Sequence, residues 1–322
     1  MVDAAVEHDP SRSAPSGAAA AGHSWGGALM LLLTRLVRVL PFMARSWLGY
    51  LLGFIGGLFP SREARIAKLQ LRAFFGPTPP FLVARVFANA GRTMLESLQL
   101  APFLAKANRR VSAPNWDEVQ RWIADDRPLI ALTGHTGNWD LLAAYTIHRG
   151  IPLTTVGREA QNPTAQQILR SMRENYGIET IWRSDRGGVK RLLECMRDRR
   201  TVAALIDQDT RVDSVFVPFF GHPVKTPSAL IVLGQKAQAR FVSAFMFRTG
   251  PFRFETFIQE LPSSGSVEDI LAAYNRNLED LLRRFPSQWV WFHKRWRSRP
   301  DGETMGSRRY LQWLKGLPPR GA

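Results

Sequence analysis

The sequence predicts an α/β domain whose mostly parallel central sheet is flanked by helices, preceded by a membrane-associated N-terminal helical segment. From residue 128 onward, apolar or β-branched runs alternate with helical patterns, and this alternation is typical of a parallel sheet. The runs that predict strands are PLIALT, PLTTV, IETIW, TVAALI and FVSAFMF, with RFETFIQE as a further candidate. The helical patterns between them are NWDLLAAYTIH, TAQQILRSMRENY, GVKRLLECMRDR and PSALIVLGQKAQA.

A last helix is predicted to begin after Ser266. Ser266 and Asp269 have the spacing of a capping box, an apolar stripe follows, and Pro286 ends the pattern.

The charge of the chain predicts a polyanionic partner. Its 322 residues include 43 lysines and arginines against 27 acidic residues, a formal net charge of +16. Such a surplus favours nucleic acid, an anionic membrane surface or a phosphorylated substrate as partner. Cys195 is the only cysteine, which excludes an intramolecular disulfide, and no cysteine–histidine cluster predicts a metal site.

The chain divides into four predicted parts. Residues 1–23 are rich in Ala, Ser, Gly and Pro and predict a disordered tail. Residues 24–60 are apolar with interspersed arginines, which favours a segment that lies in or dips into the membrane interface; a buried helix pair is the alternative. Residues 61–305 form the predicted α/β domain, and residues 306–322 a C-terminal tail.

The stretch GHTGNWD, residues 134–140, is the strongest candidate for chemistry. It follows a predicted buried strand, and Asn138 is a good N-cap for the helix behind it. His135 would then lie in the loop, with the Asp140 carboxylate folded back to accept a hydrogen bond from one imidazole nitrogen. In the alternative interpretation, Asp140 only complements the helix dipole.

Polar residues at other predicted strand ends are candidates for substrate binding. The carboxyl ends of parallel strands meet at one sheet edge, where ligands of such sheets usually bind. Lys225 is predicted to open a helix whose N-terminus would favour an anion. The full set of candidates is Arg158, Arg183, Asp207, Gln208, Asp209 and Lys225.

Four separated motifs stand in order along the chain: His135 and Asp140 at their spacing, VGREAQNP, IDQDTRVDSVFVPFFGHPVKTPSAL and PSQWVWFHKRWRSRPDG. Together they resemble the lipid A biosynthesis (lauroyl/myristoyl) acyltransferases, within the His-x4-Asp lysophospholipid acyltransferase-like superfamily. The resemblance implies acyl transfer from a thioester, on acyl carrier protein or coenzyme A, to a hydroxyl of a membrane glycolipid. It implies that His135 is the general base and Asp140 its orienting carboxylate, without a further cofactor, at the cytoplasmic face of a bacterial inner membrane.

Three alternatives remain open at this point. A phosphatidylinositol mannoside acyltransferase would share the His-x4-Asp core. A basic nucleic-acid-binding protein would use the positive charge, and the cations and tryptophans of residues 291–299 would suit either nucleic acid or lipid headgroups. A non-catalytic membrane scaffold would need neither His135 nor Asp140.

Overall fold

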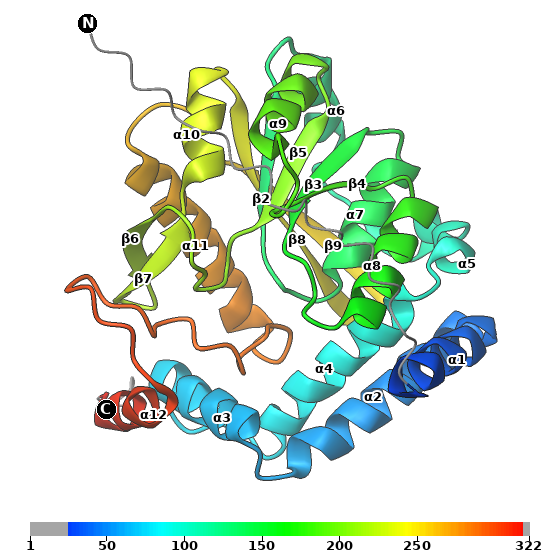
Figure 1. The fold of residues 1–322 in the computed structure, drawn as a ribbon, viewed down its shortest axis with the longest axis vertical. Helices are drawn as coiled ribbons and strands as arrows, with labels where there is room; N and C mark the ends of the chain where they lie inside the picture. Colours follow the sequence, from blue (N-terminus) through cyan, green and yellow to red (C-terminus); the bar gives the residue numbers. More distant parts are fainter. Residues whose placement is uncertain (1–24, 318–322) are drawn as a thin grey trace, which may run out of the picture.

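A seven-stranded sheet forms the centre of the molecule in the computed structural model, which describes residues 25–317 (Figure 1). Its strand order is β1-β9-β8-β2-β5-β3-β4. The five strands β8, β2, β5, β3 and β4 run parallel, whereas β9 pairs antiparallel with β8. The mostly parallel α/β prediction is therefore confirmed. The strands are β1 Val111–Ser112, β2 Leu129–Thr133, β3 Leu153–Gly157, β4 Glu179–Trp182, β5 Thr201–Leu205, β8 Arg240–Gly250 and β9 Arg253–Glu260.

Helices cover both faces of this sheet because its strands are apolar on both sides. Ile130 and Leu132 of β2 join one buried cluster, whereas Leu129 and Ala131 join another. The first cluster includes side chains of α9 (Gly188–Arg197), α10 (Ala229–Lys236) and α11 (Val267–Arg284). The second includes side chains of α6 (Trp116–Ala124) and α7 (Trp139–His148), and α8 (Pro163–Asn175) lies next to β4. α11 begins at the expected Ser266–Asp269 capping box.

The N-terminal helices pack beside the sheet domain (Figure 1). They are α1 Trp25–Val39, α2 Phe42–Leu58, α3 Arg62–Phe75 and α4 Leu82–Ser97, followed by the short α5 Ala101–Leu104 and the 3-10 turn Ala107–Arg109. α2 and α4 are in close contact, since a Cβ at Gly49, Gly53 or Gly57 would collide with the α4 backbone. These glycines therefore have a packing role.

No single helix among residues 25–317 is both long and apolar enough to cross a membrane. α2 and α3 together pass this test by length and composition, but they meet at an angle of 86°. The expected tail at residues 1–23 lies outside the described residues.

The arginines of the N-terminal segment do not all face outward. Arg45 is only 1 % exposed and donates hydrogen bonds to the carbonyls of Arg38, Leu40 and Gln99. Arg38 donates from Nε to the Leu98 carbonyl, 3.2 Å away. These guanidinium groups satisfy carbonyls near the ends of α1 and α4, so they join the segment to the rest of the protein.

Two further segments differ from the sequence prediction. Residues 214–227 form a hairpin of β6 (Ser214–Phe219) and β7 (His222–Pro227), whose turn places Phe220 and Gly221 at positive φ. Lys225 is consequently a strand residue and does not open the following helix. Part of the expected C-terminal tail forms α12 (Ser307–Gly316), which buries Tyr310 and Leu314 and packs against α3.

Candidate active site

The loop after β2 holds His135 at the carboxyl edge of the parallel strands. Gly137 adopts a φ of +49°, and a Cβ there would collide with the Met246 carbonyl, so this position requires glycine. Asn138 caps α7 as expected, since its side chain accepts a hydrogen bond from Leu141 N–H at 2.9 Å. The strand, tight loop and capped helix predicted from GHTGNWD are therefore present.

Asp207, at the end of the neighbouring strand β5, holds the histidine in place. Its Oδ1 lies 2.8 Å from Nδ1 of His135, and its Oδ2 accepts from the His135 backbone N–H, also at 2.8 Å. Trp289 Nε1 donates to the same Oδ2 at 2.7 Å. The carboxylate is fully buried, whereas the His135 side chain is 26 % exposed.

These contacts define which nitrogen of His135 is available for chemistry. Burial alone would raise the pKa of the Asp207 carboxyl, but the nearby imidazole and the hydrogen bonds from His135 and Trp289 lower the pKa to about 2. The carboxylate is thus ionised at neutral pH and can only accept, so Nδ1 carries the proton. The lone pair of a neutral His135 ring is then on Nε2.

Asp140 does not contact the imidazole, which corrects the expected His135–Asp140 hydrogen bond. Its carboxylate lies 3.7 Å from the guanidinium of Arg173 on α8, and both side chains are largely buried. The reason is the position of each residue: Asp140 lies in the first turn of α7 and lines a pocket against the sheet, whereas His135 precedes that helix. The partner of His135 comes from a neighbouring strand.

The aromatic and basic C-terminal segment supports the loop after β5. His293 Nε2 accepts a hydrogen bond from Asp209 N–H at 3.0 Å, and burial lowers the pKa of His293 to about 3, which keeps the ring neutral. Ser298 donates to Asp209 through both its backbone N–H and its hydroxyl. Arg295 and Trp296 are almost fully buried. The segment is therefore mostly a structural clamp, contrary to the expected headgroup or nucleic-acid surface.

A buried polar network on the other side of the loop fixes its helix cap. Asn138 donates from Nδ2 to Glu96 Oε2 at 2.9 Å, and Arg248 donates to the same oxygen at 3.1 Å. All three side chains are buried, and the Glu96–Arg248 pair joins α4 to β8. Asn138 is thus held from both ends, which keeps the histidine loop in one conformation.

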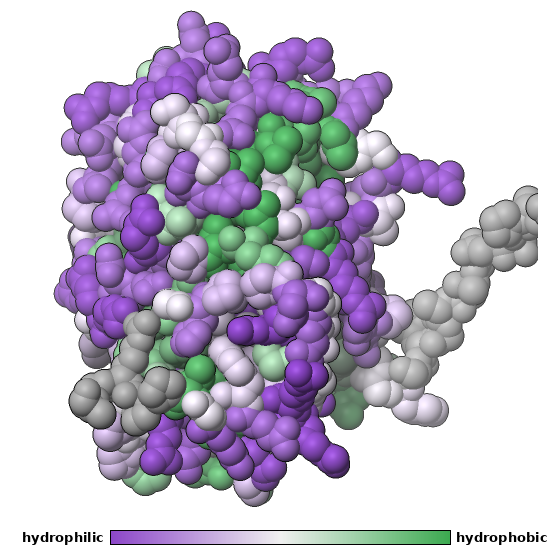
Figure 2. Space-filling model, turned by 90° about the vertical axis from the view of Figure 1, so that its left-hand side faces the viewer, coloured by the Kyte–Doolittle hydropathy of each residue, from purple (hydrophilic) through white to green (hydrophobic). Residues whose placement is uncertain are grey.

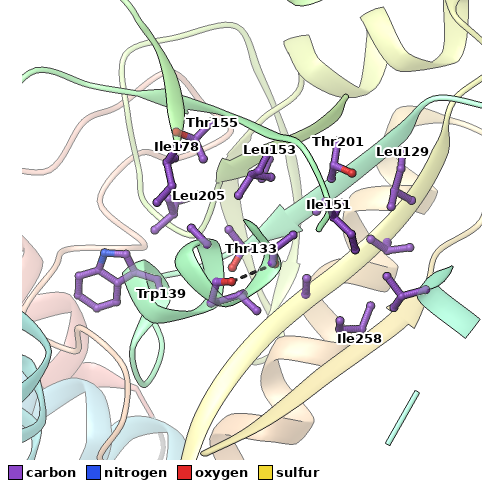
Figure 3. A pocket seen from close by; sticks show the side chains of 18 of the residues that line it. Leu129, Thr133, Trp139, Ile151, Leu153, Thr155, Ile178, Thr201, Leu205 and Ile258 are labelled. Atoms are coloured by element: carbon purple, nitrogen blue, oxygen red, sulfur yellow. Dashed lines mark hydrogen bonds between the residues drawn. The ribbon is translucent and has the colours of Figure 1, made fainter. Parts of the chain in front are cut away.

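An apolar slot runs between the sheet and α7 (Figure 3). It extends from Leu129 and Thr201, at the amino ends of β2 and β5, toward Thr133 and Trp139 beside the histidine loop. The Trp139 ring also packs edge-on against His135, with centroids 5.1 Å apart. The slot is narrow, with a volume of about 70 Å³, and its walls are mostly apolar. Small side chains leave this space open: Ala131, Ala143, Ala203 and Ala244.

The remaining predicted residues lie at the same sheet edge as His135, except for Lys225 on β7. The Gln208 amide is 3.3 Å from His135 Nδ1. Arg158, Arg183 and Asp209 line a second cavity at the same sheet edge. Within residues 25–317, no group of three or more histidine, cysteine or acidic side chains has a geometry that could hold a metal ion. Sequence reasoning missed Arg211 and Arg297 in this cavity. It also missed Trp289 and His293, which form hydrogen bonds with Asp207 and Asp209.

Trp139 lines the apolar slot and also packs against His135, whose Nδ1 is bound to Asp207, and this combination suits an enzyme that handles acyl chains. Comparison with known proteins agrees with this class: the model of the bacterial lipid A biosynthesis acyltransferase family matches residues 18–298. The chain belongs to this family and is an acyltransferase, as the motif resemblance implied.

Individual relatives share modest identity with the chain. It is 23% identical over 290 residues to a lipid A biosynthesis acyltransferase of Haemophilus influenzae, covering 87% of this chain and 90% of the relative. It is 24% identical over 276 residues to a lipid A biosynthesis palmitoleoyltransferase of Escherichia coli, covering 82% and 89%. It is also 25% identical over 165 residues to a phosphatidylinositol mannoside acyltransferase of Mycobacterium tuberculosis, covering 50% and 52%.

Proposed function

We propose that the protein transfers a fatty acyl chain from an acyl thioester to a hydroxyl of a membrane glycolipid, with His135 as general base. The observation that carries this proposal is the hydrogen bond of 2.8 Å between His135 Nδ1 and the buried Asp207 carboxylate. It directs the lone pair of Nε2 away from Asp207, and the carboxylate stabilises the imidazolium that forms when the ring takes a proton. In this mechanism Asp207 has the role that sequence reasoning gave to Asp140.

The reaction proceeds by direct transfer. The acceptor hydroxyl gives its proton to Nε2 of His135 as its oxygen attacks the thioester carbonyl. The tetrahedral intermediate then collapses, the carbon–sulfur bond breaks, and the leaving thiolate receives the proton from the imidazolium. The acyl thioester is a co-substrate, on acyl carrier protein or coenzyme A, and the mechanism uses no further cofactor.

Most backbone N–H groups of the histidine loop are not available to stabilise the developing oxyanion. The backbone N–H groups of His135, Thr136 and Gly137 already donate to Asp207, to the Gly134 carbonyl and to the Gln288 carbonyl. We therefore assign the oxyanion to the first-turn N–H groups of α7, where the helix dipole favours negative charge, or to an arginine at the sheet edge.

The apolar slot is the proposed site of the acyl chain, with Asp140 and Arg173 at its wall. The slot follows β2 for five residues, roughly 13 Å at about 3.3 Å per residue. Its depth beneath Trp139 then limits the length of the chain that enters.

Filling the slot is expected to shorten the acyl chains that the enzyme uses. Ala203 lies opposite Ala131 in the register of β5 and β2, in the middle of the slot. Ala203→Leu should lower kcat/KM for long-chain thioesters by roughly tenfold or more while sparing short ones, because side-chain atoms replace the end of the chain. Rates with a series of donor lengths measure this.

The control is Ala204→Leu, which adds the same atoms on the opposite face of β5, within the other core cluster. Thermal unfolding of both variants separates loss of fold from loss of specificity. If folded Ala203→Leu shows the same dependence of kcat/KM on acyl-chain length as the wild type, the slot is not the binding site of the acyl chain.

Membrane attachment is proposed for α1 and α2. On the face of the molecule that Figure 2 shows, hydrophilic residues surround a narrow band of apolar ones. Most of the large apolar side chains that are exposed among residues 25–317 belong to the α1–α2 segment: Trp25, Leu29, Leu32, Leu33, Leu36, Val39, Met43, Trp47, Leu51, Leu52, Ile55, Leu58 and Phe59. Soluble proteins rarely expose so many large apolar side chains along one segment, and an interfacial helix would bury them in lipid. The cytoplasmic face of a bacterial inner membrane is the proposed location.

Charges on this surface are expected to release the protein from vesicles. Leu51→Glu with Leu52→Glu should lower the partition coefficient for anionic phospholipid vesicles by at least about tenfold, because each carboxylate opposes insertion. Val189→Glu with Leu193→Glu, on the exposed face of α9, is the matched control. Equal vesicle binding by both double variants would show that α2 is not the attachment surface.

The acceptor is proposed to be a lipid A precursor, with a phosphatidylinositol mannoside as the second candidate because of the partial relative. Purified protein, a labelled acyl thioester and each acceptor in turn test this choice. Label in the lipid A precursor supports the proposal, whereas transfer to the mannoside alone favours the second candidate. Transfer to neither contradicts the proposed function.

A further inference from the structure

Four arginines meet in a cavity beside the histidine loop, which we call the arginine basin. Arg158 follows β3, Arg183 follows β4, Arg211 lies beyond β5, and Arg297 comes from the C-terminal segment. They line a cavity of about 440 Å³ together with Asp209 and Thr210. The four residues are distant in the sequence, so the fold itself collects these charges.

The positive charge of the basin is poorly neutralised by the protein. Within residues 25–317, Asp209 is the only carboxylate that lines it, and this side chain already accepts from Ser298 and lies 3.5 Å from Arg297 Nε. Among the described residues, neither Arg158, Arg183 nor Arg211 forms an ion pair. Burial, then the charge of Arg158, lowers the pKa of Arg183, while Glu159 nearby acts in the opposite direction.

One polar group in the basin also lacks a hydrogen-bond partner within the described chain. The Thr210 hydroxyl is buried without one, and the buried Arg297 Nε has only the Asp209 carboxylate, 3.5 Å away. Buried polar groups are normally hydrogen-bonded, so an orphaned hydroxyl in a cationic cavity indicates an anionic ligand with oxygens that can accept from it.

The basin and the histidine belong to one site. Asp207 bonds His135, and Asp209, two residues further on, lines the basin. The strands that carry the first two arginines follow β5 in the sheet order, and β5 is the neighbour of β2. One acceptor molecule can therefore place an anionic group in the basin and a hydroxyl near Nε2.

The negative charge and the number of terminal oxygens of the ligand distinguish between two kinds of phosphate ester. A phosphomonoester has about two negative charges at neutral pH and three terminal oxygens, whereas a phosphodiester has one charge and two such oxygens. Four guanidinium groups with one carboxylate match the former. We propose that the arginine basin binds a phosphomonoester of the acceptor glycolipid. This inference rests on the proposed function and specifies its acceptor.

The test uses one glycolipid acceptor with its phosphomonoester and the same acceptor after phosphatase treatment. Arg211→Gln and Arg297→Gln should each raise KM for the phosphorylated acceptor roughly tenfold or more, with kcat within about twofold. KM for the dephosphorylated acceptor should already be high and insensitive to both changes. Arg186→Gln, which removes an exposed arginine close to Arg183 but outside the basin, is the matched control.

The pH dependence separates a monoester from a diester. KM for the phosphorylated acceptor should fall as the pH rises through about 6, where a phosphomonoester takes its second charge. Equal KM values for the two acceptors, or variants that raise only the donor KM, would overturn the proposal.

A failure of the proposed acyltransferase function can be told apart from a failure of the proposed anion site. If the wild-type protein acylates neither acceptor, calorimetry with inorganic phosphate still tests the basin. Binding by wild type and Arg186→Gln that is lost in Arg211→Gln and Arg297→Gln supports the anion site. Absence of phosphate binding by the wild type overturns it.

Discussion

His135→Ala is expected to lower kcat for acyl transfer by about 100- to 10,000-fold, since a positioned general base contributes about this factor. The hydrogen bond from Nδ1 to Asp207 leaves Nε2 as the basic nitrogen of the neutral His135 ring. The side chain is 26 % exposed, so its removal should leave the fold intact. Initial rates at saturating donor and acceptor measure the effect, with thermal unfolding as the check on folding.

The control is His148→Ala, at the last residue of α7 and outside the site. It should leave kcat within about twofold of the wild-type value, because surface substitutions away from a site have small effects. Transfer by folded His135→Ala at the wild-type rate would mean that the acceptor hydroxyl loses its proton to another group.

Asp207→Asn should have the second-largest effect, with kcat lowered about 100-fold or more. The amide removes the negative charge that stabilises the imidazolium. Its NH2 group would also face one of the N–H donors from which the carboxylate now accepts a hydrogen bond, and that bond would be lost. Some of the loss will be structural, because Trp289 and the His135 backbone also depend on this carboxylate. The pH dependence of kcat in the variant reports the change in basicity of His135 apart from stability.

Asp140→Asn is the informative comparison for that experiment. Asp140 pairs with Arg173 at the slot wall, so its substitution should act mainly on the donor KM and less on kcat. A larger loss of kcat in Asp140→Asn than in Asp207→Asn would restore Asp140 as the residue that acts through His135.

The fold was largely predictable because its sheet strands are short apolar runs between amphipathic helices. The β6–β7 hairpin was not, since its turn requires positive φ at Phe220, a residue type that rarely signals a turn. The helix α12 was missed because its few apolar residues, such as Tyr310 and Leu314, acquire a partner only when α3 folds beneath them.

The site was predictable residue by residue but not in its pairings. His135 and Asp207 are 72 positions apart, and their contact requires that β2 and β5 be neighbours. Strand order is a property of the packed sheet, so spacing along the chain favoured Asp140 instead. The same limit applies to Arg45, whose three carbonyl partners could not be identified from an apolar segment.

Single-turnover transfer tests the central claim most directly, that His135 delivers the acyl chain straight from thioester to glycolipid. Excess enzyme is mixed with a labelled acyl thioester and the glycolipid acceptor, and samples are quenched at successive times. The masses of the lipid and of the intact protein are then measured by mass spectrometry. The account predicts that label passes from donor to glycolipid without an acylated protein, at a rate lost in His135→Ala. Label accumulating on the protein before the lipid, or unchanged transfer by His135→Ala, would contradict it.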